Sequence, residues 1–148
     1  MRGGTENLYG IVGLAKALER SCAHLDQDTQ HIRMLKQRMI QGLQEKIPGV
    51  QFNGMSADAD RSLYTVLNVS LPASEDNSML LFNLDLHQVS VSGGSACSSG
   101  AQLGSHVLRA LDCDPQRGAV RFSFSRHNTV EEINYATHAV ASLYPVNV

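Results

Sequence analysis

The sequence lacks the features that mark membrane-spanning, secreted and nucleic-acid-binding proteins. No apolar stretch approaches the ~20 residues that a spanning helix needs, and the N-terminus carries no hydrophobic signal segment. The net charge is −2 and no run of basic residues occurs, which argues against nucleic acid or an anionic membrane surface as a partner. We therefore expect a protein that binds neither nucleic acid nor membrane.

Cysteine is scarce, and its spacing excludes two further classes. The three cysteines, Cys22, Cys97 and Cys113, are odd in number and form no C-x-x-C pair, which argues against a disulfide framework and a zinc site. The six histidines are scattered without metal-ligand spacing, and none pairs with Cys97 in a pattern that would indicate a Cys–His hydrolase. This usage suits a reducing compartment, so we predict a cytoplasmic protein.

What remains has the composition and pattern of one soluble globular domain. Hydrophobic residues make up 43% of the 148 residues and charged residues 18%. Apolar spacing and turn residues predict an α/β (α+β) fold with a mixed or antiparallel sheet and helices packed on one face. The expected helices cover 5–46, in two segments with Thr5 as the first N-cap, then 74–87, 105–111 and 129–144. The expected strands cover 50–53, 63–71, 88–92 and 119–125.

A nine-residue run of small side chains surrounds one of the cysteines. The segment Ser-Gly-Gly-Ser-Ala-Cys-Ser-Ser-Gly at 92–100 places Cys97 in a loop where no neighbour has a larger side chain. A thiol in such a loop can be approached and deprotonated, and the thiolate is the reactive form. A small buried cysteine at a strand end would be chemically inert. The residues alone leave both interpretations open.

The expected strand over 119–125 separates its side chains by period two. Val120, Phe122 and Phe124 share one face, while Arg121 shares the other face with two serines. An arginine among hydroxyls can present its planar fork to a carboxylate or phosphate. An exposed edge arginine, or one paired with a nearby glutamate (Glu131 or Glu132), is the more ordinary interpretation, and the residues alone favour it.

Five segments together resemble a known family. They are Arg-Gly-Gly-Thr-Glu-Asn at 2–7, Ile-Val-Gly-Leu-Ala-Lys-Ala-Leu at 11–18, the cysteine loop at 92–100, Val-Leu-Arg-Ala-Leu at 107–111 and Val-Arg-Phe-Ser-Phe-Ser-Arg-His-Asn-Thr at 120–129. In this order they resemble the C-terminal portion of cysteine desulfurases of the NifS/IscS type, which are class V aminotransferase-fold enzymes. The resemblance implies the small C-terminal domain of a fold-type I pyridoxal-phosphate enzyme.

The resemblance also implies a role for three residues. Cys97 would take sulfur from cofactor-bound L-cysteine as a persulfide and leave L-alanine, for iron–sulfur cluster assembly or another sulfur-transfer pathway. Arg121 would bind the substrate carboxylate. Thr5 would contact the phosphate of pyridoxal 5'-phosphate in the neighbouring subunit of a homodimer. The implied partners are L-cysteine and an iron–sulfur scaffold or other sulfur-acceptor protein.

One departure from the family pattern bears on activity. The family's cofactor-binding lysine lies upstream of the Arg-x-Gly-Thr segment, whereas Lys16, Lys36 and Lys46 all fall in the first expected helix, on surfaces where an ammonium stays protonated. We therefore expect this chain to be part of a longer enzyme, inactive alone and without bound cofactor. Residues 1–22 would form a linking helix region and residues 23–148 the small domain that carries the cysteine loop.

Other functions remain open within and outside this family. A selenocysteine lyase or a transaminase would share the fold, although a transaminase needs no loop thiol. A non-catalytic module that accepts sulfur at Cys97 and passes it to another protein would use the same loop.

Overall fold

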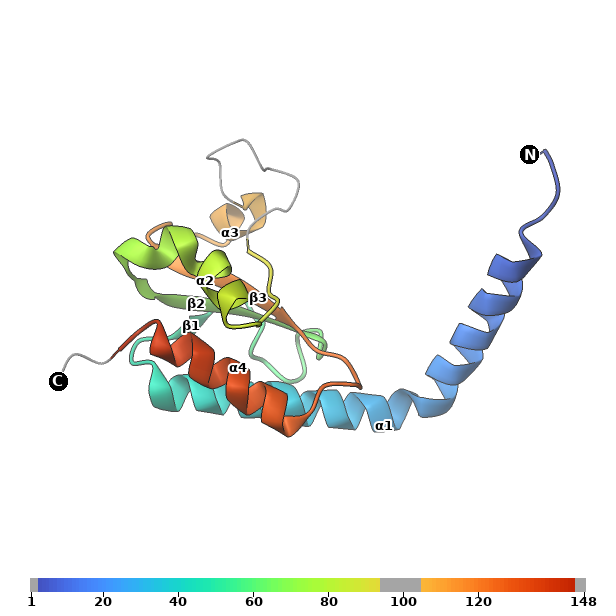
Figure 1. The fold of residues 1–148 in the computed structure, drawn as a ribbon, viewed down its shortest axis with the longest axis horizontal. Coiled ribbons are helices and arrows are strands. Elements are labelled where there is room, and N and C mark those ends of the chain that lie inside the picture. Colours follow the sequence, from blue (N-terminus) through green and yellow to red (C-terminus); the bar gives the residue numbers. More distant parts are fainter. Residues whose placement is uncertain (1–2, 94–104, 146–148) are drawn as a thin grey trace.

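The computed structural model describes residues 3–93 and 105–145 (Figure 1). Three strands form one antiparallel sheet, and helices α1 and α4 lie together along one side of it. This arrangement confirms the expected α+β class with an antiparallel sheet. The elements are α1 (Leu8–Lys46), β1 (Gln51–Phe52), β2 (Val66–Ala73), the 3-10 turn η1 (Glu75–Met79), α2 (Leu80–Leu86), α3 (His106–Ala110), β3 (Arg117–Ser123) and α4 (Val130–Ser142).

Helix α1 is one element of 39 residues, so the expected division into two helices is wrong. The predicted cap is also wrong, because Asn7 and not Thr5 is the N-cap. The Asn7 side chain accepts a hydrogen bond from the backbone N–H of Gly10 at 3.1 Å. Thr5 precedes the helix and is exposed. The helix ends before Pro48-Gly49, where Gly49 adopts φ 79°, a conformation that glycine tolerates without strain.

The two halves of α1 differ in what covers them. The second half buries Leu35, Met39 and Leu43 in the core, whereas the first half projects away from the sheet and bends relative to the second (Figure 1). Large apolar side chains on the first half, such as Leu14 and Leu18, are 72% and 62% exposed. Among the described helices, α1 included, none has the length and apolar character that crossing a membrane requires.

The sheet has the strand order β1–β2–β3, and both pairings are antiparallel. Strand β2 is central, as the sequence predicts, but it begins at Val66 rather than residue 63. It also continues past Pro72 to Ala73, with a shift of register between Leu71 and Ala73 that accommodates the proline. The proline therefore ends the regular pairing without ending the strand.

One face of the sheet forms the core with α1 and α4. Leu67 and Val69 of β2 are fully buried, as is Val120 of β3, and Phe122 and Phe124 are 5% and 6% exposed. These side chains form one cluster with the buried residues of α1 and α4. The period-two division of residues 120–125 is therefore confirmed, because Arg121 and the two serines that follow it are exposed.

Two connecting elements differ in detail from expectation. The helix expected over 74–87 is divided into η1 and α2, and the strand expected over 88–92 is reduced to a single bridge between Ser92 and Arg121. Gln88 has φ 57°, which interrupts the extended conformation that a strand needs. The capping box of Thr129 and Glu132 is present at the start of α4, as predicted.

Candidate functional site

A row of polar residues crosses the sheet on the face opposite the core. Arg121 of β3 lies opposite Asn68 of β2, and Asn68 in turn lies opposite Asn53, which follows β1 and donates its backbone N–H to the Asn68 carbonyl at 3.0 Å. On its other side, Arg121 exchanges two backbone hydrogen bonds with Ser92, at 2.7 and 3.1 Å. Four segments distant in sequence thus meet in one line, Asn53–Asn68–Arg121–Ser92.

Arg121 faces a cavity of about 220 Å³ beside this row. Among the described residues, no carboxylate lines this cavity. Besides Arg121 and Asn68, the lining includes Ser92 and Gly93 on one side of the segment 94–104 and Ser105 on the other. Within residues 3–93 and 105–145, no hydrogen bond or ion pair engages the Arg121 guanidinium. This cavity therefore offers unpaired N–H donors and a positive charge to an anionic group.

A second arginine on the same strand, Arg117, has a guanidinium that is occupied by hydrogen bonds within the protein. Arg117 donates to the Ser70 hydroxyl at 2.8 Å, the Ser70 carbonyl at 2.9 Å and the Gly49 carbonyl at 2.6 Å. These contacts connect the ends of β2 and β3 to the turn after α1. Arg117 thus has a structural role, while the Arg121 guanidinium makes no such contact in the described part of the chain.

The salt-bridge interpretation of Arg121 is not supported. The carboxylate of Glu132 accepts hydrogen bonds from the Asn128 side chain and the Thr129 backbone, both at 3.1 Å. Both bonds lower the pKa of Glu132, and the bond from Asn128 has the larger effect. No ion pair between Arg121 and either Glu131 or Glu132 occurs among the described residues. The remaining arginine of this region, Arg126, pairs instead with Asp28 of α1 at 3.2 Å.

The structure describes only one of the other two predicted site residues. Cys97 lies outside the described residues, so the structure does not test its role or the predicted loop. Thr5 precedes α1, whose first half projects away from the sheet and from α3 (Figure 1). Within one chain, Thr5 and Arg121 therefore do not form a common site.

A larger cavity, about 520 Å³ in volume, lies between the segment after α2, the end of β3 and the start of α4. Phe122 and Phe124 contribute to its lining, and Glu131 and Glu132 add two carboxylates. These negative charges disfavour an anionic ligand. The smaller cavity beside Arg121 is therefore the better candidate for binding a carboxylate.

The expectation that all three lysines lie on helix surfaces is wrong for Lys36. Its side chain is only 5% exposed, and its ammonium donates to the Ser62 hydroxyl at 2.8 Å and the Leu63 carbonyl at 2.9 Å. Burial lowers the pKa of Lys36, and the nearby positive charge of Arg33 lowers it further, while Asp58 raises it. Lys36 occupies this position because its stem lies in the buried stripe of α1 and its head reaches the 54–62 loop.

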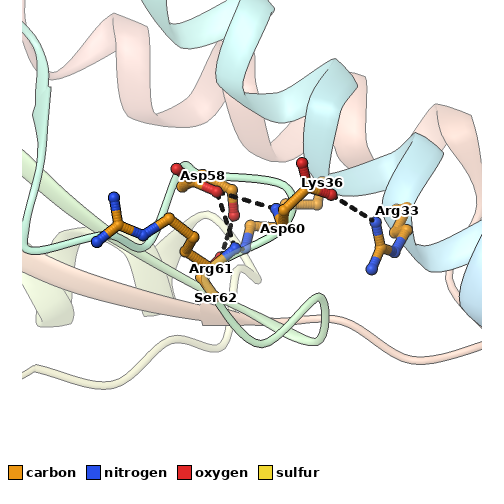
Figure 2. A network of polar contacts seen from close by, with 6 residues as sticks. All are labelled: Arg33, Lys36, Asp58, Asp60, Arg61 and Ser62. Atoms are coloured by element: carbon orange, nitrogen blue, oxygen red, sulfur yellow. Dashed lines mark hydrogen bonds and ion pairs between the residues drawn. The ribbon is translucent and has the colours of Figure 1, made fainter.

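The loop that receives Lys36 is held by its own hydrogen bonds (Figure 2). Asp58 accepts from the backbone N–H groups of Asp60 and Arg61 at 2.9 and 2.8 Å, and the Ser62 hydroxyl donates to the Asp58 carbonyl at 2.5 Å. Lys36 is therefore committed to structural partners. Lys16, by contrast, is exposed and paired with Glu19 at 2.9 Å. Lys16 and Lys36 are therefore both engaged by other groups, and neither presents a free amine for a carbonyl cofactor.

Sequence reasoning identified Arg121 but missed Asn68 and Asn53. The expected strand over 63–71 is largely apolar on both faces, and the amide of Asn68 between Leu67 and Val69 was a usable signal. Its pairing with Asn53 depends on strand register, which the sequence does not give.

Comparison with known proteins places the chain in a family. The model of the family described as Aminotransferase class-V matches residues 1–135. A cysteine desulfurase of Gluconacetobacter diazotrophicus is 38% identical over 135 residues, which are 90% of this chain and 33% of the relative. A protein of Bacillus subtilis described as a putative cysteine desulfurase IscS 1 is 36% identical over 145 residues, 96% of this chain and 37% of the relative. The chain thus spans about a third of the length of these curated relatives.

Solved structures agree with this placement. A NifS-like protein superposes with a TM-score of 0.75 at 29% identity, over 96% of this chain and 35% of the other. The apo form of a cysteine desulfurase from Thermococcus onnurineus superposes with a TM-score of 0.72 at 25% identity, over 97% of this chain and 32% of the other. The chain belongs to the class V aminotransferase family and, within it, is similar to cysteine desulfurases of the NifS/IscS type.

Proposed function

We propose that the chain is the C-terminal part of a cysteine desulfurase, in which Arg121 binds the carboxylate of L-cysteine and Cys97 receives its sulfur. The observation that supports the proposal is the Arg121 guanidinium, which has no hydrogen-bond or ion-pair partner in the described part of the chain and faces a cavity that none of the described carboxylates lines. An arginine fork binds a carboxylate through two parallel hydrogen bonds, which fixes both the position and the orientation of the bound group. L-Cysteine is the substrate that the names of the relatives indicate.

Cys97 is proposed to act at the same cavity. Gly93 and Ser105, the described residues on either side of segment 94–104, both line it. In the overall reaction, a sulfur–sulfur bond forms at Cys97 as the carbon–sulfur bond of L-cysteine breaks. The electron pair of the broken bond stays with the carbon product, which takes up a proton and leaves as L-alanine. The persulfide on Cys97 is then available to an iron–sulfur scaffold or another sulfur acceptor.

Pyridoxal 5'-phosphate, when bound in the complete enzyme, supplies the electron sink that carbon–sulfur cleavage requires. Lys16 and Lys36 are engaged by other groups, and the family's cofactor-binding lysine lies upstream of the segment at 2–7, so we expect the chain alone to retain no cofactor and to turn over no L-cysteine. Thr5 is proposed to contact the cofactor phosphate of the neighbouring subunit of a homodimer. Its exposure at the start of α1, away from the cavity of its own chain, is compatible with a contact across subunits.

A chimera tests the proposal directly. The upstream two thirds of the Gluconacetobacter diazotrophicus relative would be joined to residues 1–148, and the product incubated with pyridoxal phosphate and L-cysteine. We expect equal amounts of L-alanine and protein-bound sulfane sulfur, with the sulfur mapped to Cys97 by mass spectrometry. Cys97→Ser should abolish the persulfide, whereas the matched Cys22→Ser, at an exposed cysteine of α1, should retain it. Sulfur located on Cys22 or Cys113 would refute the assignment.

A sulfur relay is the second candidate, and the placement of the lysines favours it for the chain on its own. In this function Cys97 accepts sulfur from a persulfide donor without any cysteine turnover. Incubation of the 148-residue chain with a low-molecular-weight hydropersulfide separates the two candidates. Persulfide on Cys97 together with an inactive chimera would favour the relay.

A further inference from the structure

We propose that Asn68 is a second carboxylate-binding residue beside Arg121, and that Asn53 positions it. This inference rests on the proposed function of Arg121, since it adds a donor to the same cavity. The observation behind it is the polar row Asn53–Asn68–Arg121, in which each residue lies directly opposite the next across the sheet.

The strand register brings Asn68 and Arg121 close together. The backbone groups of Arg121 are used by Ser92. The Phe124 N–H donates to the Thr65 carbonyl at 2.8 Å, so Thr65 and Phe124 are a hydrogen-bonded pair, and in an antiparallel ladder this type recurs at every second pair of the register. Asn68 and Arg121 are therefore a non-hydrogen-bonded antiparallel pair, the type in which Cα atoms lie ~4.5 Å apart and side chains are closest. Both side chains line the same cavity.

A hydrogen bond from Asn53 fixes the orientation of the Asn68 amide. The Asn53 side-chain NH₂ donates to the Asn68 side-chain oxygen at 2.8 Å. With its oxygen occupied, the Asn68 amide presents its NH₂ group away from Asn53, toward the side on which Arg121 lies. The row therefore places a neutral donor next to a charged one, which matches the two acceptor oxygens of a carboxylate.

The backbone of Asn68 is also held firmly. Its carbonyl accepts from the Asn53 N–H at 3.0 Å and from the Ser56 hydroxyl at 2.9 Å. Asn68 is half-buried, and no carboxylate of residues 3–93 or 105–145 lines the cavity and competes for its NH₂ group. Fixed donors bind an anion without the cost of ordering a mobile side chain. Asn53 does not line the cavity, so its part is positioning and not contact.

The test follows carboxylate binding by nuclear magnetic resonance in the 148-residue chain. L-Alanine is titrated into ¹⁵N-labelled protein, and the side-chain signals of Asn68 Nδ2 and Arg121 Nε are recorded. L-Alaninamide, which lacks the carboxylate, is the ligand control. We expect both signals to move with L-alanine and neither to move with L-alaninamide.

Two variants then isolate the asparagine row. Asn53→Asp keeps the shape of the side chain but can only accept, so the Asn68 amide should turn its NH₂ toward position 53 and present oxygen to Arg121. Asn68→Ala removes the donor without adding a charge. Each should weaken L-alanine binding about tenfold, as expected for a hydrogen bond to a charged group. Gln51→Glu is the matched control. It adds a negative charge on the same face of the sheet, two residues along β1 from Asn53 and opposite Ser70, and should change the affinity less than about twofold.

The outcomes separate this inference from the proposed function. If L-alanine moves Arg121 but both asparagine variants bind as wild type does, the inference is refuted and the role of Arg121 stands. If L-alanine moves neither signal in the wild-type chain, carboxylate binding by Arg121 fails, and the role of Asn68 fails with it. Tenfold weaker binding in both asparagine variants, with Gln51→Glu unaffected, supports the inference.

Discussion

The two faces of strand β3 have opposite roles although they share one backbone. On one face, Val120 and Phe122 of β3, together with Phe124 just after it, are packed into the core, with at most 6% of any side chain exposed. On the other, Arg121 and Ser123 are exposed, and Arg121 makes no side-chain hydrogen bond within the described residues. The comparison indicates that the first face stabilises the fold and the second is free to bind a ligand. Substitutions on the two faces should therefore separate stability from binding.

The largest effect is expected for Phe122→Ala on the core face. Removing a buried phenylalanine side chain leaves a cavity, and we expect the free energy of unfolding to fall by about 3–5 kcal/mol. Urea denaturation followed by circular dichroism measures this change. The matched control is Phe82→Ala on α2, where the side chain is 54% exposed and the loss should stay below about 1 kcal/mol. Equal losses in the two variants would show that β3 does not contribute to the core as described.

For Arg121→Ala, on the face of β3 opposite the core, we expect a loss of activity with little change in stability. In the chimera, loss of a bidentate contact with the carboxylate should lower kcat/KM by an amount equivalent to about 2–4 kcal/mol. Arg121→Lys should recover only part of this, because a point charge does not reproduce the fork. The free energy of unfolding should change by less than about 0.5 kcal/mol in both variants. Unaltered kinetics in Arg121→Lys would remove Arg121 from the site.

The difference between the faces could be predicted because it depends only on local geometry. Alternation by two follows from the pleat of any strand, so residues 120–125 divide correctly without knowledge of their neighbours. The capping box at Thr129 is equally local, and it too was predicted correctly. The contribution of Asn53 was not predictable, because it depends on the register between β1, β2 and β3.

The errors in the first helix have a related cause. Apolar residues recur at helical spacing along the whole of α1, so their periodicity places an apolar stripe on both halves. Only the second half meets the sheet and α4, so Leu35 and Leu43 are buried while Leu14 and Leu18 remain exposed. Periodicity predicts which side chains share a face, but it does not predict whether another element covers that face. For the same reason Lys36, in the covered half, is buried and not on a helix surface.

Lys36 is the charged residue among the buried side chains of α1, so substituting it shows whether its charge contributes to stability on the core side of the helix. Its pKa in the folded protein lies below the usual value of 10.5. At a pH between the lowered pKa of the folded protein and the ordinary pKa of the unfolded chain, Lys36 is protonated in the unfolded chain but not in the folded protein. The free energy of unfolding should therefore rise with pH in this interval. Lys36→Met should remove that rise and change stability near pH 7 by less than about 1 kcal/mol.

Urea midpoints measured from pH 7 to 10.5 provide the readout for Lys36. Lys16→Met is the matched control, since it makes the same substitution at an exposed position of α1 and should keep the wild-type pH slope. If Lys36→Met also retains the slope, another group must be its source.

The smallest effect is expected for Ser123→Ala, which tests whether binding is a property of the whole open face or of one position. Ser123 lies on the same face as Arg121, two residues along β3, but it lines the larger cavity with Glu131 and Glu132 instead of the cavity beside Arg121. We expect unfolding free energy to change by less than about 0.5 kcal/mol and L-alanine binding to stay within about twofold of wild type. Denaturation and the L-alanine titration of the 148-residue chain measure both quantities. A tenfold loss of binding would place the carboxylate in the larger cavity and overturn the assignment of the site to the row through Asn68 and Arg121.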